Sequence, residues 1–238
     1  MSSEVYNEAD VSHQVWDIIA DSFDKTRSRP WGLCLDFINS IPSSSCVVDL
    51  GCGNGRHLIP CAQRCRLTIG VDISKNLLRI TQKKLIDKKV DNALLVRGNI
   101  TNLPFKDNSA DAVIYIATLH AIKGRVNRIR SLVELRRILK SDGRALISVW
   151  SRYQGRFLSR VIKNLFIRED GDEFGDTIVY WRQDHLDTPR FYHLYSKNEF
   201  IKDIKDAGLK ILSIRPVRFH SRILYDNYFA LVEKKDKG

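Results

Sequence analysis

The sequence predicts an α/β protein with a mostly parallel, doubly wound sheet, and three observations support this prediction. Between residues 46 and 150, short apolar runs alternate with longer segments of helical periodicity, which is typical of parallel strands covered by helices. Glycines cluster directly after the first apolar run, where open parallel sheets bind ligands. The 238 residues, 43% of them hydrophobic, suffice for a buried core.

The expected elements follow in a regular order along the chain. Residues 1–45 show a mixed helical pattern and are expected to form an N-terminal helical cap. The apolar runs predict five strands, at Cys46–Leu50, Leu67–Asp72, Ala93–Val96, Ala112–Ile116 and Ala145–Trp150. Helical periodicity predicts two helices between them, at Lys75–Asp87 and Arg125–Lys140.

This alternation breaks after the fifth expected strand. Residues 151–190 interleave charged and aromatic residues, and we expect an insertion that contributes to the substrate site. A helix at Lys197–Ala207 and strands at Lys210–Ile214 and Asn227–Val232 then complete a seven-stranded sheet. We therefore expect residues 1–238 to form a single domain.

Composition narrows the class of protein. No uncharged apolar run approaches the roughly 20 residues that span a bilayer, and the N-terminus is too acidic for a signal peptide, so we expect a cytoplasmic protein without membrane contact. Five cysteines without zinc-site spacing predict reduced thiols and no bound metal. The net charge of +11 favours a polyanionic partner, although basic enzymes of small substrates are also common.

The segment "VVDLGCGNGRH", residues 47–57, defines the glycine loop. Its spacing is G-x-G-x-G, and Arg56 stands where a dinucleotide fingerprint needs its third glycine. Asp72 ends the next strand, where a carboxylate can accept both ribose hydroxyls of an adenosyl group. This arrangement resembles motif I and the acidic second strand of the class I S-adenosylmethionine methyltransferases, which have a Rossmann-like fold. A site for NAD, or an empty structural turn, is the alternative.

The resemblance implies S-adenosylmethionine as cofactor and assigns its contacts. Residues after the third strand would face adenine, and residues after the fourth strand would lie beside the sulfonium. His120 follows the fourth strand and is placed for the substrate, unless it makes only a local hydrogen bond. The implied cofactor-binding residues are Asp49, Gly51, Gly53, Asn54, Gly55, Asp72, Ile73, Asn99, Ile100 and Ala117.

Four segments together narrow the resemblance to one family. "DSFDKTRSRPW", the glycine loop, "LISVWSRYQG" and "PRFYHLYSKNEF" are similar to the tRNA wobble-uridine methyltransferases, over nearly the whole chain. The resemblance implies methylation of the carboxylate of 5-carboxymethyluridine at the first anticodon position, giving 5-methoxycarbonylmethyluridine. Residues 151–189 form a shorter insertion than in fungal members, and Ala121 replaces a second histidine of some relatives. The shorter insertion affects the expected extent of the tRNA contacts, and Ala121 affects the expected positioning of the substrate.

The expected chemistry needs positioning rather than a base. A carboxylate is already ionised at neutral pH, so the enzyme must hold this anion in line with the methyl group and exclude water. Guanidinium groups bind oxyanions bidentately, and aromatic rings can stack on a flipped base. Solvated ion pairs and core packing are the alternatives for these residues. The substrate-site candidates are Arg27, His120, Trp150, Arg190 and Tyr192.

Basic residues gather around the helix expected at residues 125–140 and along the penultimate strand. Contacts from such residues to phosphates supply affinity without reading sequence, although a solvated basic helix face would look the same. The candidates for binding the tRNA anticodon stem-loop are Arg29, Lys123, Arg125, Arg128, Arg136, Arg137, Arg215 and Arg218.

The resemblance also implies a protein partner. Members of the family often form heterodimers with a small zinc-binding activator protein that adds a strand to the sheet. The third strand, around "NALLVRG", is an exposed edge in the usual strand order and would receive that partner. Two other hypotheses remain: a methyltransferase of a small molecule, and a non-catalytic tRNA-binding subunit with a vestigial cofactor loop.

Overall fold

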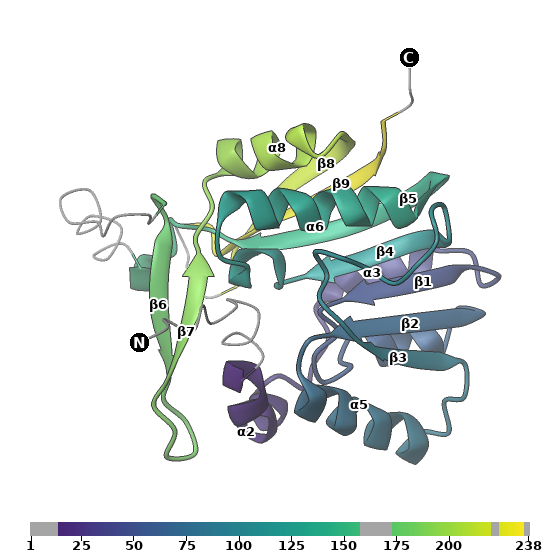
Figure 1. The fold of residues 1–238 in the computed structure, drawn as a ribbon, viewed down its shortest axis with the longest axis horizontal. Coiled ribbons are helices and arrows are strands. Elements are labelled where there is room, and N and C mark those ends of the chain that lie inside the picture. Colours follow the sequence, from purple (N-terminus) through teal and green to yellow (C-terminus); the bar gives the residue numbers. More distant parts are fainter. Residues whose placement is uncertain (1–13, 158–172, 220–223, 236–238) are drawn as a thin grey trace, which may run out of the picture.

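The computed structural model describes residues 14–157, 173–219 and 224–235. Seven strands form one sheet in the order β3-β2-β1-β4-β5-β9-β8, with helices on both faces (Figure 1). The first five strands pair in parallel, and β9 runs antiparallel to both of its neighbours. The expected seven-stranded, mostly parallel sheet is therefore confirmed. The strands are β1 (Cys46–Leu50), β2 (Leu67–Asp72), β3 (Ala93–Arg97), β4 (Ala110–Ile116), β5 (Leu139–Trp150), β8 (Leu209–Val217) and β9 (Asn227–Lys234).

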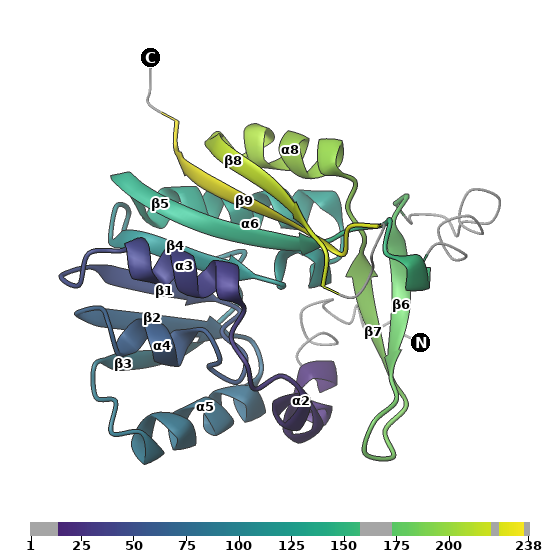
Figure 2. The same ribbon diagram turned by 180° about the vertical axis from the view of Figure 1, so that it is seen from behind.

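The helices cover the sheet from both sides (Figures 1 and 2). On one face α6 and α8 pack on the larger core cluster, and on the other face α3 and α4 pack on a second cluster. All five residues of β1 are buried between these layers, which explains its uninterrupted apolar sequence. The helices are α2 (Ala20–Thr26), α3 (Gly32–Ser40), α4 (Leu58–Ala62), α5 (Lys75–Asp87), α6 (Arg125–Ile138) and α8 (Lys197–Asp206), with 3₁₀ turns η1 (Leu119–Ala121) and η2 (Gly155–Phe157).

Local chemistry sets the helix ends. The Ser74 hydroxyl accepts a hydrogen bond from Leu77 N–H and so begins α5, while Ser196 and Glu199 form a capping box at the start of α8. Helix α6 is shorter than expected, because Leu139 is fully buried and pairs with Ala110 as the first residue of β5.

The insertion expected at residues 151–190 contains a β-hairpin and ends slightly later. Strands β6 (Asp176–Trp181) and β7 (Thr188–His193) form a separate antiparallel sheet beside the carboxyl edge of the main sheet (Figure 1). The hairpin attaches to the N-terminal helices, because Trp181 Nε1 donates to Ser22 Oγ at 2.8 Å. The first part of the expected cap, residues 1–13, and residues 158–172 lie outside the described residues.

The five cysteines are buried free thiols, as their number and spacing suggested. In the described ranges, no helix is long and apolar enough to cross a membrane.

Candidate cofactor and substrate site

The glycine loop follows β1 at the carboxyl edge of the sheet. Gly51, Gly53 and Gly55 have φ angles of +71°, +53° and +77°, in the region that glycine adopts most readily. A Cβ atom at Gly51 would stand 2.3 Å from Thr118 Cγ2, so the loop lies tightly against the turn after β4. Gly51 N–H also donates to Val71 O at 2.7 Å. Backbone geometry and close packing therefore both require glycine here.

Two buried carboxylates lie at this loop. Asp72 accepts hydrogen bonds from the N–H groups of Gly53 at 2.7 Å and Ser74 at 2.9 Å, and burial raises the pKa of Asp72 to about 6. Asp49 is 2% exposed, and its Oδ2 has no hydrogen-bond partner among the described residues. Burial, reinforced by the nearby Asp72, raises the pKa of Asp49 to about 7. The sulfonium, ammonium and ribose hydroxyls of S-adenosylmethionine suit this pair of acceptors.

Other expected cofactor residues surround the same edge. Ala117 adopts φ +56°, a strained angle for a residue with a Cβ, and its N–H donates to Ser148 Oγ at 3.0 Å. Ile73 follows β2 and is half-buried, and Ile100 is buried. Asn99 is exposed and its side chain accepts from the N–H and hydroxyl of Thr101. These residues lie at the ends of β2, β3 and β4.

Asn54 differs from the expected direct cofactor contact in where its side chain points. Its amide nitrogen donates to Asp24 Oδ1 at 2.7 Å and to Arg27 O at 3.1 Å. The Asn54 amide nitrogen thus fastens the end of α2 to the glycine loop, while its Oδ1 is buried and has no hydrogen-bond partner among the described residues.

An aromatic stack joins the ends of β4 and β5 to the hairpin. The Trp150 ring lies 4.5 Å from the Tyr192 ring and 4.9 Å from the His120 ring, with interplanar angles of 25° and 24°. Trp150 N–H donates to His120 Nδ1 at 3.2 Å, so a neutral His120 carries its proton on Nε2. The structure thus brings together three of the five expected substrate-site residues.

Arg190 lies beside this stack and is 7% exposed. Its guanidinium stands over the rings of Trp181 at 4.7 Å, Tyr192 at 5.1 Å and Trp16 at 5.8 Å, and Nη1 donates to Tyr192 Oη at 2.6 Å. Its Nε has no hydrogen-bond partner and no carboxylate pairs with it within the described residues. Burial lowers the pKa of Arg190, and nearby Arg27 lowers it further. A bound anion would relieve this uncompensated charge.

Helix α2 links the glycine loop to Arg190. A Cβ atom on Gly53 would lie 3.7 Å from the Phe23 ring, and Phe23 lies 6.0 Å from the Trp181 ring. The Arg27 guanidinium, at the end of α2, stands over the Trp181 ring at 5.4 Å. Helix α2 therefore packs against both the cofactor loop and the arginine–aromatic cluster.

The expected basic face of α6 is mostly neutralised. Arg125 pairs with Asp203 at 2.8 Å, Arg137 pairs with Glu134 at 2.7 Å, and Arg136 lies within hydrogen-bonding distance of a backbone carbonyl of α8. Arg128 is fully buried and pairs with Glu173 at 2.7 Å, so its assignment to an exposed tRNA-binding surface is wrong. It lies on the inward face of α6, which the insertion covers.

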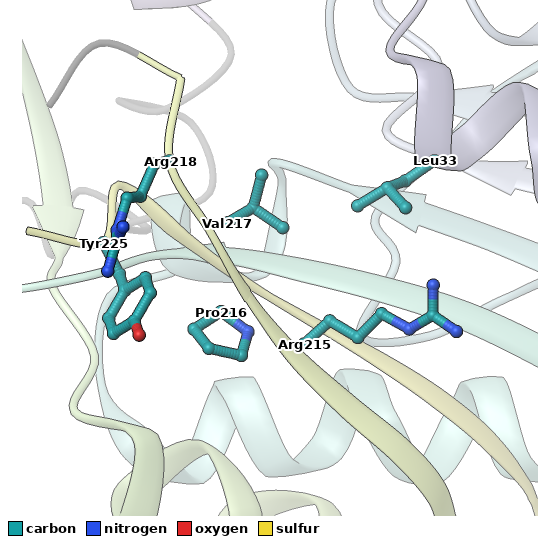
Figure 3. Close-up of a pocket in the computed structure, with 6 residues that line it drawn as sticks. All are labelled: Leu33, Arg215, Pro216, Val217, Arg218 and Tyr225. Carbon is teal, nitrogen blue, oxygen red and sulfur yellow. The ribbon is translucent and has the colours of Figure 1, made fainter. Parts of the chain in front are cut away.

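The remaining expected tRNA-binding residues lie at the surface. Arg29 and Lys123 are exposed near the carboxyl edge, after α2 and after η1. Arg215 and Arg218 are exposed on the edge strand β8 and at its end, where they line an open groove (Figure 3).

Sequence reasoning missed Trp16 and Trp181, which enclose Arg190, because their partners lie far away in the chain. It also missed a buried network around His193. His193 Nδ1 lies 2.6 Å from Asp176 Oδ1, and Nε2 lies 3.0 Å from Glu199 Oε1. The hydrogen bonds to these carboxylates raise the pKa of His193, although its burial opposes them. The network ties β7 to α8.

The comparisons with known proteins agree with this geometry. A family profile described as "Methyltransferase domain" matches residues 48–147. A "Putative methyltransferase" of Encephalitozoon cuniculi is 34% identical over 202 residues, covering 84% of this chain and 87% of that protein. The chain belongs to the methyltransferase family. The methyltransferase is therefore an enzyme, and S-adenosylmethionine is its cofactor.

The narrower resemblance is confirmed by named relatives. The methyltransferase is 28% identical over 254 residues to the tRNA (carboxymethyluridine(34)-5-O)-methyltransferase of Schizosaccharomyces pombe, covering 97% of this chain and 99% of that one. A Xenopus tropicalis protein of the same name is 40% identical over 147 residues, which are 62% of this chain. The match spans only 22% of the Xenopus protein's length.

Solved structures confirm the fold. A SAM-dependent methyltransferase of Methanosarcina mazei superposes with a TM-score of 0.74 at 18% identity, covering 87% of this chain and 98% of that chain. A Haloferax volcanii putative methyltransferase, solved in complex with the Trm112 methyltransferase activator, has a TM-score of 0.69 at 16% identity, covering 95% and 99%.

Proposed function

We propose that the methyltransferase methylates the carboxylate of 5-carboxymethyluridine at the tRNA wobble position, giving 5-methoxycarbonylmethyluridine. The observation that carries the proposal is Arg190, a buried guanidinium without a carboxylate partner among the described residues, enclosed by Trp16, Trp181 and Tyr192. The names of the relatives identify a uridine carboxylate as the anion that their sites accept. The stacked rings of Trp150 and Tyr192 suit a flipped uracil base.

Each residue has a defined part in this reaction. S-adenosylmethionine, when bound, supplies the electrophilic methyl group. Asp72 would accept hydrogen bonds from its ribose, and Asp49 would offer an acceptor to its cationic groups. Arg190 and Arg27 hold the substrate carboxylate, and the aromatic rings exclude water. These residues would hold one carboxylate oxygen in line with the methyl group, so that transfer to this oxygen would leave the electron pair of the S–CH₃ bond on sulfur and would move no proton.

The two alternative functions account for fewer features of the site. A non-catalytic subunit would not need the intact carboxylate pair and glycine loop, and a small-molecule enzyme would not need exposed arginines at the site edge. The expected cytoplasmic location stays a prediction.

The partner is also proposed. Strand β3 ends the sheet order, and Leu94 on it is 55% exposed, so an unpaired apolar edge is available. The Haloferax neighbour forms a complex with an activator. A small zinc-binding activator that added a strand at β3 would form a heterodimer with this methyltransferase.

Single-turnover methylation of an anticodon stem-loop carrying 5-carboxymethyluridine tests the proposed function. At saturating RNA, Arg190→Ala should slow methyl transfer by about thirty- to a thousandfold, since it removes the counter-charge of the reacting anion. Arg190→Lys should restore part of the rate, because an ammonium keeps the charge and loses the planar fork. Cofactor affinity should stay unchanged.

Two results would contradict the proposal. A wild-type enzyme that methylates unmodified and carboxymethylated stem-loops equally would not recognise the carboxylate. A wild-type rate for Arg190→Ala would place the carboxylate elsewhere. Arg144→Ala, on an exposed part of β5 away from the site, is the matched control.

A further inference from the structure

A shallow groove of about 580 Å³ opens along the end of the edge strand β8 (Figure 3). The Arg218 guanidinium lies over the Tyr225 ring at 4.8 Å, and Tyr225 remains 37% exposed. Phe219, also 41% exposed, extends this aromatic surface and contacts Trp31 at 5.0 Å. The groove is lined by Leu33, Arg215, Pro216, Val217, Arg218 and Tyr225. Exposed rings interleaved with arginines form a surface that suits stacked bases and phosphates.

The groove lies at the same edge of the sheet as the cofactor loop. Strand β8 is parallel to β5, because each pairs antiparallel with β9, so the carboxyl ends of both strands point to this edge. Asp226 N–H donates to Val217 O at 2.8 Å, and Asp226 O accepts from Ser151 N–H at 2.9 Å. Ser151 directly follows Trp150 of the aromatic stack. The end of β8 and the aromatic stack are therefore joined through Asp226 and Ser151 at this edge.

The arginines of the groove differ from those of α6 in their ion pairing. Arg125, Arg128 and Arg137 each pair with a carboxylate of the protein itself. Arg215 and Arg218 have no ion pair with a carboxylate in the described part of the chain, and both are exposed. Their charge is thus available to an external anion, and phosphate is the anion that accompanies a stacking base.

We propose that this groove binds a single-stranded segment of the RNA substrate, with a base stacked against the Tyr225–Arg218 pair and phosphates against Arg215 and Arg218. The inference rests on the proposed RNA substrate and adds the nucleotides flanking the target uridine to what the enzyme recognises. Tyr225 acts as a positioning residue, since it lies outside the reacting site.

Fluorescence anisotropy with a labelled oligouridylate, without cofactor, measures this binding directly. Tyr225→Ala should weaken binding by about tenfold, the loss of one stacked base, while Tyr225→Phe should bind like the wild type. Arg218→Gln should weaken binding and lower the slope of log affinity against log salt by about 0.7, one single-strand phosphate contact. Arg144→Gln, a charge-matched control on β5, should change neither quantity.

Methylation kinetics separate this inference from the proposed function. Tyr225→Ala should raise KM for the stem-loop and leave the saturated rate unchanged. If Tyr225→Ala binds oligouridylate like the wild type, the groove is not an RNA site, whatever the enzyme methylates. If the wild type binds through the groove but leaves 5-carboxymethyluridine unmethylated, the proposed function fails and the groove assignment stands.

Discussion

The buried Asp49 should make the cofactor-free protein less stable as the pH rises. Burial and the nearby Asp72 raise the pKa of Asp49 from its usual 3.8 to about 7. The folded protein therefore holds a proton that the unfolded chain releases, so stability falls between pH 3.8 and about 7 and stays low above it. At pH 8, this difference between the folded and unfolded pKa lowers the free energy of unfolding by about 4 kcal/mol.

Asp49→Asn tests this reasoning because it removes the charge and keeps the shape. An unpaired buried amide costs about 1–3 kcal/mol, so the variant should gain about 1–3 kcal/mol at pH 8 and lose about that amount near pH 3.5, where the wild type still holds the proton in both states. For a chain of this length, each 1 kcal/mol moves the melting temperature by about 2–4 °C. The stability curves of variant and wild type should therefore cross between these pH values.

Thermal or urea unfolding of the cofactor-free protein at both pH values measures the crossing. Calorimetry at pH 8 should show weaker binding of S-adenosylmethionine to Asp49→Asn, because the carboxylate acceptor is gone. Asp142→Asn, at an exposed position, should change stability by less than about 0.5 kcal/mol at either pH. An Asp49→Asn variant that is equally destabilised at pH 3.5 and pH 8 would show that Asp49 is not held protonated, and would refute the reasoning.

Two further predictions concern packing and partner binding. Arg128→Ala should cost about 2–5 kcal/mol in urea unfolding, because it empties the fully buried site of this side chain and removes an ion pair with Glu173. Exposed Arg130→Ala should cost less than about 0.5 kcal/mol, and equal costs would place Arg128 in solvent. Leu94→Asp should abolish co-purification with a small zinc-binding protein and spare cofactor affinity, while Ile86→Asp, at another exposed apolar residue, should keep the partner. Retention of the partner by Leu94→Asp would move the interface away from β3.

The sequence predicted those parts of the fold that short stretches of the chain determine by themselves. The strand Cys46–Leu50 is buried on both faces and was predicted with the correct bounds, and Asp72 lies at the strand end where it was expected. The glycine spacing located the loop after this strand, in which all three glycines adopt positive φ angles. These features depend on neighbours within one strand and one turn.

The remaining features depend on distant contacts. Arg128 meets Glu173 45 residues later, and a helical basic pattern cannot show which arginine will be covered. Strand β6 alternates exposed and half-buried residues within a charged insertion, so its apolar signal is weak. Arg190 was expected at the end of the insertion and lies instead on a strand, where Trp16 and Trp181 enclose it from two other segments.

The separate sheet formed by β6 and β7 has a consequence for how specificity can change. Arg190 and Tyr192 lie on this hairpin, while the glycine loop and Asp72 follow strands of the main sheet. Because, among the described residues, the two strands pair only with each other, substitutions or length changes in the hairpin need not shift the register of any central strand. Acceptor choice can thus diverge while the methyl-donor half stays constant, so a hairpin exchanged between related enzymes would carry its acceptor preference with it.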